Sequence, residues 1–245
     1  MAVPDDPSGR PRLVLVHGTR LSAAQWDSYP ALLPTVEVVA VDLPGHGERL
    51  AEEFTVDAAL AVIGAAVRGA AGRPVVLAGH SLGGYLASLW ASRHPDALAG
   101  LVLIGATADP AGRVAFGYRG FARVLSLVGP HRMHRLSDAV MRLLGARTTA
   151  AGTDVAAYAA LPAAWQAVAE HCGPHLLAGP TCPVLLVNGQ WDQMRVDVAR
   201  HAAAARRARV ITVRRATHLL PLTHPAEVAD ILTDALTVTP SAARP

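Results

Sequence analysis

One serine in this chain lies between two glycines, at a point where the sequence pattern changes. Ser81 stands in the stretch GHSLG, which follows an apolar run and precedes a helical pattern. No residue is left over for a loop, so the turn must be sharp, and glycine at positions 79 and 83 avoids the clash that larger residues would make there. Such a turn strains the serine backbone, projects its hydroxyl, and sets it beside the positive end of the next helix. The pattern therefore predicts a nucleophile beside a site that favours negative charge.

A serine hydroxyl is a weak nucleophile, and histidine is the residue type best suited to activate it near neutral pH. Of the 11 histidines, His218 follows the last apolar run, where a loop would return it to the serine's edge of a sheet. We therefore expect His218 to be the base. The other histidines have simpler interpretations: packing or loop roles for His17, His46 and His80, and surface positions for His94, His201 and His224.

The elements that must position these residues are short apolar runs bounded by turn residues. Each run has four to six residues and is apolar at nearly every position, which is typical of strands buried on both faces of a parallel sheet. The predicted strands are Leu13–Val16, Val36–Val41, Pro74–Ala78, Leu101–Ile104, Val184–Val187 and Val210–Val213. Helical patterns over 56–71, 82–93, 196–206 and 225–236 fall between them, so we expect βαβ units and a doubly wound α/β fold with helices on both faces.

A segment of about 70 residues interrupts this rhythm between Asp109 and Pro180. It has no clear strand and has helix-compatible stretches near 113–128, 134–146 and 153–171. A structureless loop of that length would be unusual in a compact domain. We therefore predict a helical lid inserted at 110–179, with residues 1–109 and 180–245 forming the core domain.

Four segments of the chain resemble the α/β-hydrolase superfamily. They are LVLVHGT at Leu13–Thr19, VDLPGHG at Val41–Gly47, GHSLGG at Gly79–Gly84, and the late pair NGQWD and ATH at Asn188–Asp192 and Ala216–His218. The resemblance extends over nearly the whole chain. About a dozen residues precede Leu13, where relatives carry two further strands, so it implies a mostly parallel six-stranded sheet in the order 2-1-3-4-5-6.

The resemblance also implies the partners of Ser81. It assigns the orienting acid to Asp192, after the run Val184–Val187, with Asp109 as the alternative because some relatives carry the acid one strand earlier. An acyl transfer needs N–H donors aimed at the developing oxyanion. The residue after the nucleophile, Leu82, should supply one backbone N–H, and the resemblance assigns the other to Thr19.

Substrate-binding residues are expected near Ser81 and in the lid. Arg20 follows the oxyanion loop and could touch substrate or lie in solvent. Phe116, Phe121 and Trp165, with Met133 and Met141, could line an acyl or alcohol pocket, or could pack the lid onto the sheet.

Composition excludes several other classes of function. The 22 basic residues are all arginine, so lysine Schiff-base and P-loop chemistry are excluded. Arginines near 206–215 have no interleaved aromatic residues, which disfavours a nucleic-acid partner. No apolar window is long enough for a membrane span and no secretory signal is evident, so a cytoplasmic location is expected. The cysteines Cys172 and Cys182 are expected to be free thiols, although one bridge is possible.

Neither a cofactor nor a metal is expected. The histidine pairs His131/His134 and His171/His175 have spacings that could face one side of a helix, but no third ligand is evident nearby.

These observations predict a serine hydrolase that cleaves a small or medium carboxylic ester by a Ser-His-Asp triad through an acyl-enzyme. The same triad could serve a thioesterase, an acyl transferase, a cofactor-free perhydrolase, or a lyase or cyclase of secondary metabolism. A non-catalytic ligand receptor on the same fold is an alternative of another class. The sequence does not give the oligomeric state.

Overall fold

A computed structural model describes residues 9–110, 112 and 159–237 of the chain. The strands are β1 (Arg12–Val16), β2 (Glu37–Val41), β3 (Val75–His80), β4 (Gly100–Ile104), β5 (Val184–Gly189) and β6 (Ala208–Val213). The α-helices are α1 (Tyr29–Leu32), α2 (Val56–Arg68), α3 (Leu82–Arg93), α6 (Leu161–His171), α7 (Val198–Ala204), α8 (Leu220–Thr223) and α9 (Pro225–Thr237). Short 3₁₀ helices are η1 (Ala23–Trp26), η2 (Gly47–Arg49), η5 (Pro174–Ala178) and η6 (Gln193–Arg195).

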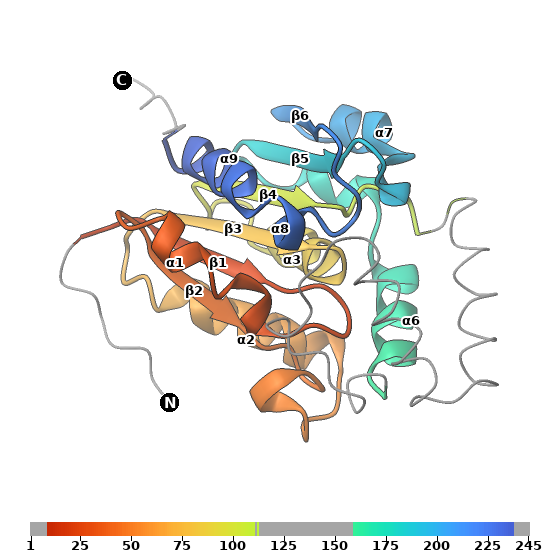
Figure 1. The fold of residues 1–245 in the computed structure, drawn as a ribbon. Helices are drawn as coiled ribbons and strands as arrows, with labels where there is room; N and C mark the ends of the chain where they lie inside the picture. The colour runs from red at the N-terminus through yellow and green to blue at the C-terminus, as the bar shows by residue number, and fades with distance from the viewer. Residues whose placement is uncertain (1–8, 111, 113–158, 238–245) are drawn as a thin grey trace.

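The six strands form one parallel sheet in the order β2-β1-β3-β4-β5-β6 (Figure 1). This confirms the predicted α/β class, strand number and strand order. At the carboxyl end of β1, Val16 pairs with Val41 on one side and with Gly79 on the other. Because all strands run the same way, the loops that follow them meet at one edge, which is where Ser81 lies.

Successive strand residues point to opposite faces and build two separate cores. Val14 and Val16 of β1 join one cluster with residues of α2, α3 and α6, whereas Leu13 and Leu15 join another with residues of η1, α1 and α9. Figure 1 shows α2 and α3 on one side of the sheet and α1 and α9 on the other. Burial on both faces explains why β1 is apolar without alternation.

The prediction that every strand is buried on both faces is wrong for the two outer strands. All five residues of β2 are only partly buried, and in β6 only Val213 is fully buried, while Val210 is 45% exposed. Both strands lie at an edge of the sheet, so each has one neighbour and incomplete helical cover. The exposed Arg209 of β6 discourages pairing with another chain.

The prediction of a surface position is wrong for His201. This residue is 2% exposed, and its Nδ1 lies 3.1 Å from the carbonyl oxygen of Asp197, one turn earlier in the chain. It is the fully buried residue of α7, which packs against β5, β6 and η5. Burial lowers the pKa of His201, so it is neutral at pH 7.

The described part of the predicted lid lies against the core. In α6, Leu161, Ala164 and Val168 are buried, and the last two belong to the same cluster as residues of α3. Cys172 follows this helix and contacts the backbone oxygen of Tyr85 at 3.6 Å. The division at 110–179 stays a prediction, because most of that segment falls outside the described residues.

Two cysteines and one ion-pair group complete the interior. Cys172 and Cys182 are buried and free. At the amino end of the sheet, Arg12 is 1% exposed and makes two hydrogen bonds with Glu37, from Nε at 2.8 Å and from Nη2 at 2.7 Å. Arg73 pairs with the same carboxylate at 2.7 Å.

Within residues 9–110 and 159–237, no helix is both long and apolar enough to cross a membrane.

Candidate active site

Ser81 occupies a sharp turn between β3 and α3. Its backbone has φ 52° and ψ −116°, a strained conformation for a residue with a side chain. A Cβ at Gly79 would run into the Gly83 carbonyl, and one at Gly83 would run into the carbonyl of Val16. The glycine spacing is therefore required by backbone packing, as the sequence predicts. Ser81 is 4% exposed, and its N–H donates to the Ile104 carbonyl at 2.8 Å.

Asp192 and His218 are brought together by the loops after β5 and β6. His218 Nδ1 lies 3.0 Å from Asp192 Oδ1, which also accepts the N–H of Met194 at 2.8 Å. Burial alone would raise the pKa of Asp192, but the hydrogen bond and charge of His218 and the Met194 amide hold it below its usual value. An ionised carboxylate accepts from Nδ1–H, so the other ring nitrogen, Nε2, is left free to take a proton.

The alternative acid, Asp109, has a different partner. Its Oδ2 lies 2.7 Å from Nη1 of Arg200, and its backbone N–H donates to Asp197 Oδ2 at 2.9 Å. The carboxylate paired with His218 is that of Asp192. Asp197 precedes α7, but its side chain bonds to the loop after β4 and not to its own helix.

His80, the residue before Ser81, lies against His218. The rings of His80 and His218 lie with their centroids 4.9 Å apart. Within the described residues, the Ser81 hydroxyl makes no hydrogen bond to His218; such bonds are often long outside a Michaelis complex. His218 is the more accessible of the two, with a side chain 19% exposed.

The loop after β1 is fixed by buried side chains. His17 is fully buried, its Nδ1 lies 2.8 Å from the Gly18 carbonyl oxygen, and its Nε2 accepts the Leu43 N–H at 3.1 Å. Burial, followed by the neighbouring His46, lowers the pKa of His17 to about 3, so the ring is neutral with its proton on Nδ1. Since a carbonyl only accepts, His17 donates to Gly18 and sets the plane of the Gly18–Thr19 peptide.

That peptide plane decides where the predicted oxyanion donor points. In a trans peptide the N–H is directed opposite to the C=O, so the Thr19 N–H faces away from His17. Leu82 is the first residue of α3, where backbone N–H groups have no partner within the helix. In the described part of the chain, neither the Thr19 amide nor the Leu82 amide donates to another group. The two amides are thus available to a negatively charged atom.

The predicted substrate-binding residues have mixed outcomes. Arg20 is partly buried and adopts a left-handed conformation, with φ 63°. Trp165 of α6 is partly buried and packs against the core cluster, which matches its alternative packing role. Phe116, Phe121, Met133 and Met141 lie outside the described residues.

Sequence reasoning missed Gly105, which follows β4. Its φ is 60°, and a Cβ there would lie 2.9 Å from His218 Nδ1 and 3.0 Å from Asp192 Oδ2. Glycine at this position lets the side chains of Asp192 and His218 approach the end of β4. The available signal was a glycine directly after an apolar strand; Gly18 similarly lies two residues after the end of β1.

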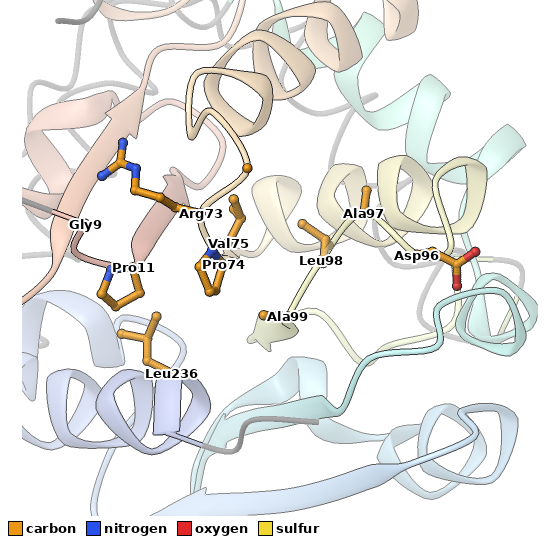
Figure 2. Close-up of a pocket in the computed structure, with 11 residues that line it drawn as sticks. Gly9, Pro11, Arg73, Pro74, Val75, Asp96, Ala97, Leu98, Ala99 and Leu236 are labelled. Atoms are coloured by element: carbon orange, nitrogen blue, oxygen red, sulfur yellow. The ribbon is translucent and has the colours of Figure 1, made fainter. Parts of the chain in front are cut away.

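A separate hollow of about 520 Å³ lies at the opposite edge of the sheet, near the amino ends of β1, β3 and β4 (Figure 2). Its two charged lining residues are already engaged: Arg73 pairs with Glu37 at 2.7 Å, and Asp96 accepts the Thr181 hydroxyl at 3.0 Å. It is remote from Ser81 and is not the candidate acyl site.

Among the described residues, no group of three or more His, Cys, Asp or Glu side chains is arranged to hold a metal ion. His171 and His175 are among the described residues. His131 and His134, the other pair with helical spacing, lie outside them.

Comparisons with known proteins match this architecture. A pimeloyl-[acyl-carrier protein] methyl ester esterase of Neisseria meningitidis is 29% identical over 93% of this chain and 94% of its own length. The lipase LipV of Mycobacterium tuberculosis is 37% identical, but the match covers 43% of this chain and only 39% of the lipase. A thermophilic esterase from Thermogutta terrifontis has a similar structure, with a TM-score of 0.73 and 24% identity over 95% of this chain and 91% of that chain.

The model that describes the alpha/beta hydrolase family matches residues 13–231, which is most of the sequence. Together with the six-stranded parallel sheet, this match confirms the prediction of a hydrolase-fold enzyme. The chain belongs to the alpha/beta hydrolase family.

Proposed function

We propose that this enzyme is a serine esterase that hydrolyses small or medium carboxylic esters. The observation that carries the proposal is the 3.0 Å contact between His218 Nδ1 and Asp192 Oδ1, next to the strained turn that holds Ser81. The relative that aligns over nearly its full length is named as a methyl ester esterase, which supports the ester class.

In this proposal the reaction begins when His218 Nε2 removes the hydroxyl proton of Ser81. The serine oxygen attacks the ester carbonyl carbon, and the carbonyl electron pair moves onto its oxygen. The tetrahedral intermediate then expels the alkoxide, which takes the proton from His218 and leaves as the alcohol. An acyl group now esterifies Ser81.

Water completes the cycle. His218 takes a proton from water as the hydroxide oxygen attacks the acyl carbon, and the second intermediate breaks the bond to Ser81. The proton returns to the serine oxygen and a carboxylic acid leaves. Asp192 stabilises the charged imidazole in both halves without becoming protonated itself.

The amides of Thr19 and Leu82 would stabilise the negative oxygen of both intermediates. Preorganised donors of this kind are worth roughly 10²–10³-fold in kcat each. The His17 bond to the Gly18 carbonyl supports this role, because it fixes the peptide that carries the Thr19 N–H.

The test is the substitution Ser81→Ala. Hydrolysis of p-nitrophenyl acetate and butyrate should be lost, together with labelling by a fluorophosphonate probe, while the circular dichroism spectrum is retained. Ser92→Ala is the matched control, because Ser92 lies on α3, the helix that follows Ser81, and its hydroxyl donates to the Leu89 carbonyl at 2.8 Å. Undiminished turnover in Ser81→Ala would refute the nucleophile assignment.

A second measurement addresses the acyl acceptor and the acyl chain length. A chain-length series of p-nitrophenyl esters, compared with acyl thioesters and followed by mass spectrometry, identifies the acyl acceptor and the preferred acyl length. Products carrying the acyl group on a nucleophile other than water would contradict hydrolysis as the reaction.

A further inference from the structure

His80, the last residue of β3, lies between two catalytic loops. It is 2% exposed, and its Nε2 is 2.9 Å from the backbone oxygen of His218, a residue 138 positions later in the chain. Its ring is tilted by 42° to the His218 ring at a centroid distance of 4.9 Å. His80 therefore contacts both the backbone and the ring of His218, the proposed base.

The partners of His80 determine where its proton lies. A backbone oxygen can only accept a hydrogen bond, so Nε2 must carry the proton and donate to His218. Burial, followed by the neighbouring His218, lowers the pKa of His80 to about 3, so Nδ1 carries no proton at neutral pH. With a pKa of about 3, the unprotonated Nδ1 is a weak base at neutral pH, so His80 is poorly suited to take the proton of Ser81.

The other side of the His80 ring lies against the oxyanion loop. A Cβ at Gly18 would be 2.7 Å from His80 Nδ1 and 3.1 Å from Cε1, so the Gly18 backbone packs directly on the ring. The Gly18 N–H donates to Gln25 Oε1 at 2.9 Å, and the same oxygen lies 3.4 Å from His80 Nδ1. One buried ring thus separates the loop that carries the Thr19 amide from the loop that carries His218.

We propose that His80 is a positioning residue, which sets the distance between the oxyanion loop and His218 by donating to the His218 carbonyl and packing on Gly18. This inference rests on the proposed function, since it assigns His80 a role in that reaction. A displacement of about 1 Å in a reacting group can lower the rate roughly 10²-fold. Loss of the His80 donor would also leave the His218 carbonyl without this partner, and the loop would move to satisfy it.

Two variants of similar size separate hydrogen bonding from packing. In His80→Gln the amide nitrogen can reach the position of Nε2 and donate to the His218 carbonyl, whereas His80→Met fills similar space without a donor. We expect kcat, per fluorophosphonate-titrated site, to fall roughly 10–100-fold in His80→Met with KM changed less than about threefold. His80→Gln should recover most of that loss.

His94→Met is the control for loss of a histidine that contacts a carbonyl. His94 Nδ1 lies 2.9 Å from the Trp90 oxygen at the far end of α3, and this substitution should leave kcat unchanged. Equal kcat values per titrated site in His80→Met and His80→Gln, whether high or low, would overturn the role of the donated hydrogen bond.

The packing half of the inference is tested by a double-mutant cycle with Gly18. In Gly18→Ala the new methyl group should push the His80 ring and lower kcat at least tenfold; in a His80→Ala background, where the ring is absent, the same change should lower kcat less than about threefold. Additive effects in the cycle would overturn the contact as a coupling element.

A readout independent of turnover keeps this inference separate from the proposed function. The proton on His218 Nδ1 is hydrogen-bonded to Asp192. Its NMR resonance should shift or broaden in His80→Met and persist in His80→Gln. If the wild-type chain hydrolyses no ester but this pattern holds, the proposed function fails and the positioning role stands. An unaltered resonance in His80→Met overturns the positioning role, whatever the activity.

Discussion

Gly105 provides the sharpest test of how the acid–base pair is assembled. Its φ of 60° lies in the left-handed region, and the hypothetical Cβ falls 2.9 Å from His218 Nδ1 and 3.0 Å from Asp192 Oδ2. Non-bonded carbon contacts prefer about 3.5 Å or more, so Gly105→Ala requires a shift of roughly 0.6 Å in one or both partners. We expect this shift to stretch the hydrogen bond between His218 and Asp192, the proposed base and acid.

Two separate consequences follow for Gly105→Ala. An alanine in the left-handed conformation costs about 1–2 kcal/mol of folding free energy, which for a chain of this size lowers Tm by about 2–8 °C. A misplacement of several tenths of an ångström in the base should lower kcat by roughly tenfold to a hundredfold, given that 1 Å can cost about 10²-fold. The stability loss alone would not change kcat per folded molecule.

Gly72→Ala separates the two effects. Gly72 also has a positive φ, 85°, but nothing lies within 4 Å of its hypothetical Cβ. Both variants should lose stability in thermal unfolding through the left-handed backbone, with Gly105→Ala losing at least as much as Gly72→Ala. Only Gly105→Ala should lose kcat on p-nitrophenyl butyrate, measured per fluorophosphonate-titrated site. If Gly105→Ala turns over within twofold of Gly72→Ala, the steric explanation is refuted.

Three further changes have predictable results. Asp192→Asn should lower kcat by roughly 10³–10⁴-fold with little change in KM, because an amide can donate to Nδ1 and no longer fixes the His218 tautomer. Stability in urea should fall as pH drops from about 6.5 towards 4, since His17 and His80 have pKa values lowered to about 3 in the fold and the unfolded chain binds their protons first, at up to about 1.4 kcal/mol per pH unit for each. Glu37→Gln should lower the unfolding free energy by about 3 kcal/mol, because it leaves the buried Arg12 guanidinium without its carboxylate.

Each of these predictions has an outcome that contradicts it. For Asp192→Asn, a full rate would mean that another group orients His218. A urea midpoint that is flat between pH 7 and pH 5 would show that the buried histidines are not held neutral. For the ion pair, Glu52→Gln is the control, because Arg49 and Glu52 are 43% and 48% exposed and the change should cost under about 1 kcal/mol; equal losses in the two variants would contradict the role of burial.

The sequence predicts the sheet and the strained turn at Ser81 well because both depend on local pattern. Each inner strand is a continuous apolar run, and Ser81 is marked by glycines on both sides within five residues. The strand order came from the resemblance and not from periodicity. Asp192 and His218 were likewise identified by their position after particular strands.

Features that depend on distant contacts were missed or misjudged. His201 looks like any polar residue of an amphipathic helix, and only the packing of α7 onto β5 and β6 buries it. The outer strand β6 reads as apolar, yet its place at the edge leaves Val210 45% exposed. The contact of His80 with His218 joins residues 138 positions apart, which no local pattern reveals.

A glycine lies at or just after the end of three strands that meet at the site. Each of these glycines lets another segment of the chain pack closely against the backbone. Glycines 18, 105 and 189 follow or end β1, β4 and β5, and each faces a segment that carries a proposed catalytic residue. A Cβ at Gly18 would strike the His80 ring, one at Gly105 would strike the pair of Asp192 and His218, and one at Gly189 would run into the carbonyls of Ala216 and Thr217 in the loop of His218. Loops that approach this closely transmit a small displacement directly to one another. Alanine at these positions should therefore change the reaction rate more than the losses in stability would suggest. The sequence signal for such positions is a glycine at the end of a strand or within two residues after it.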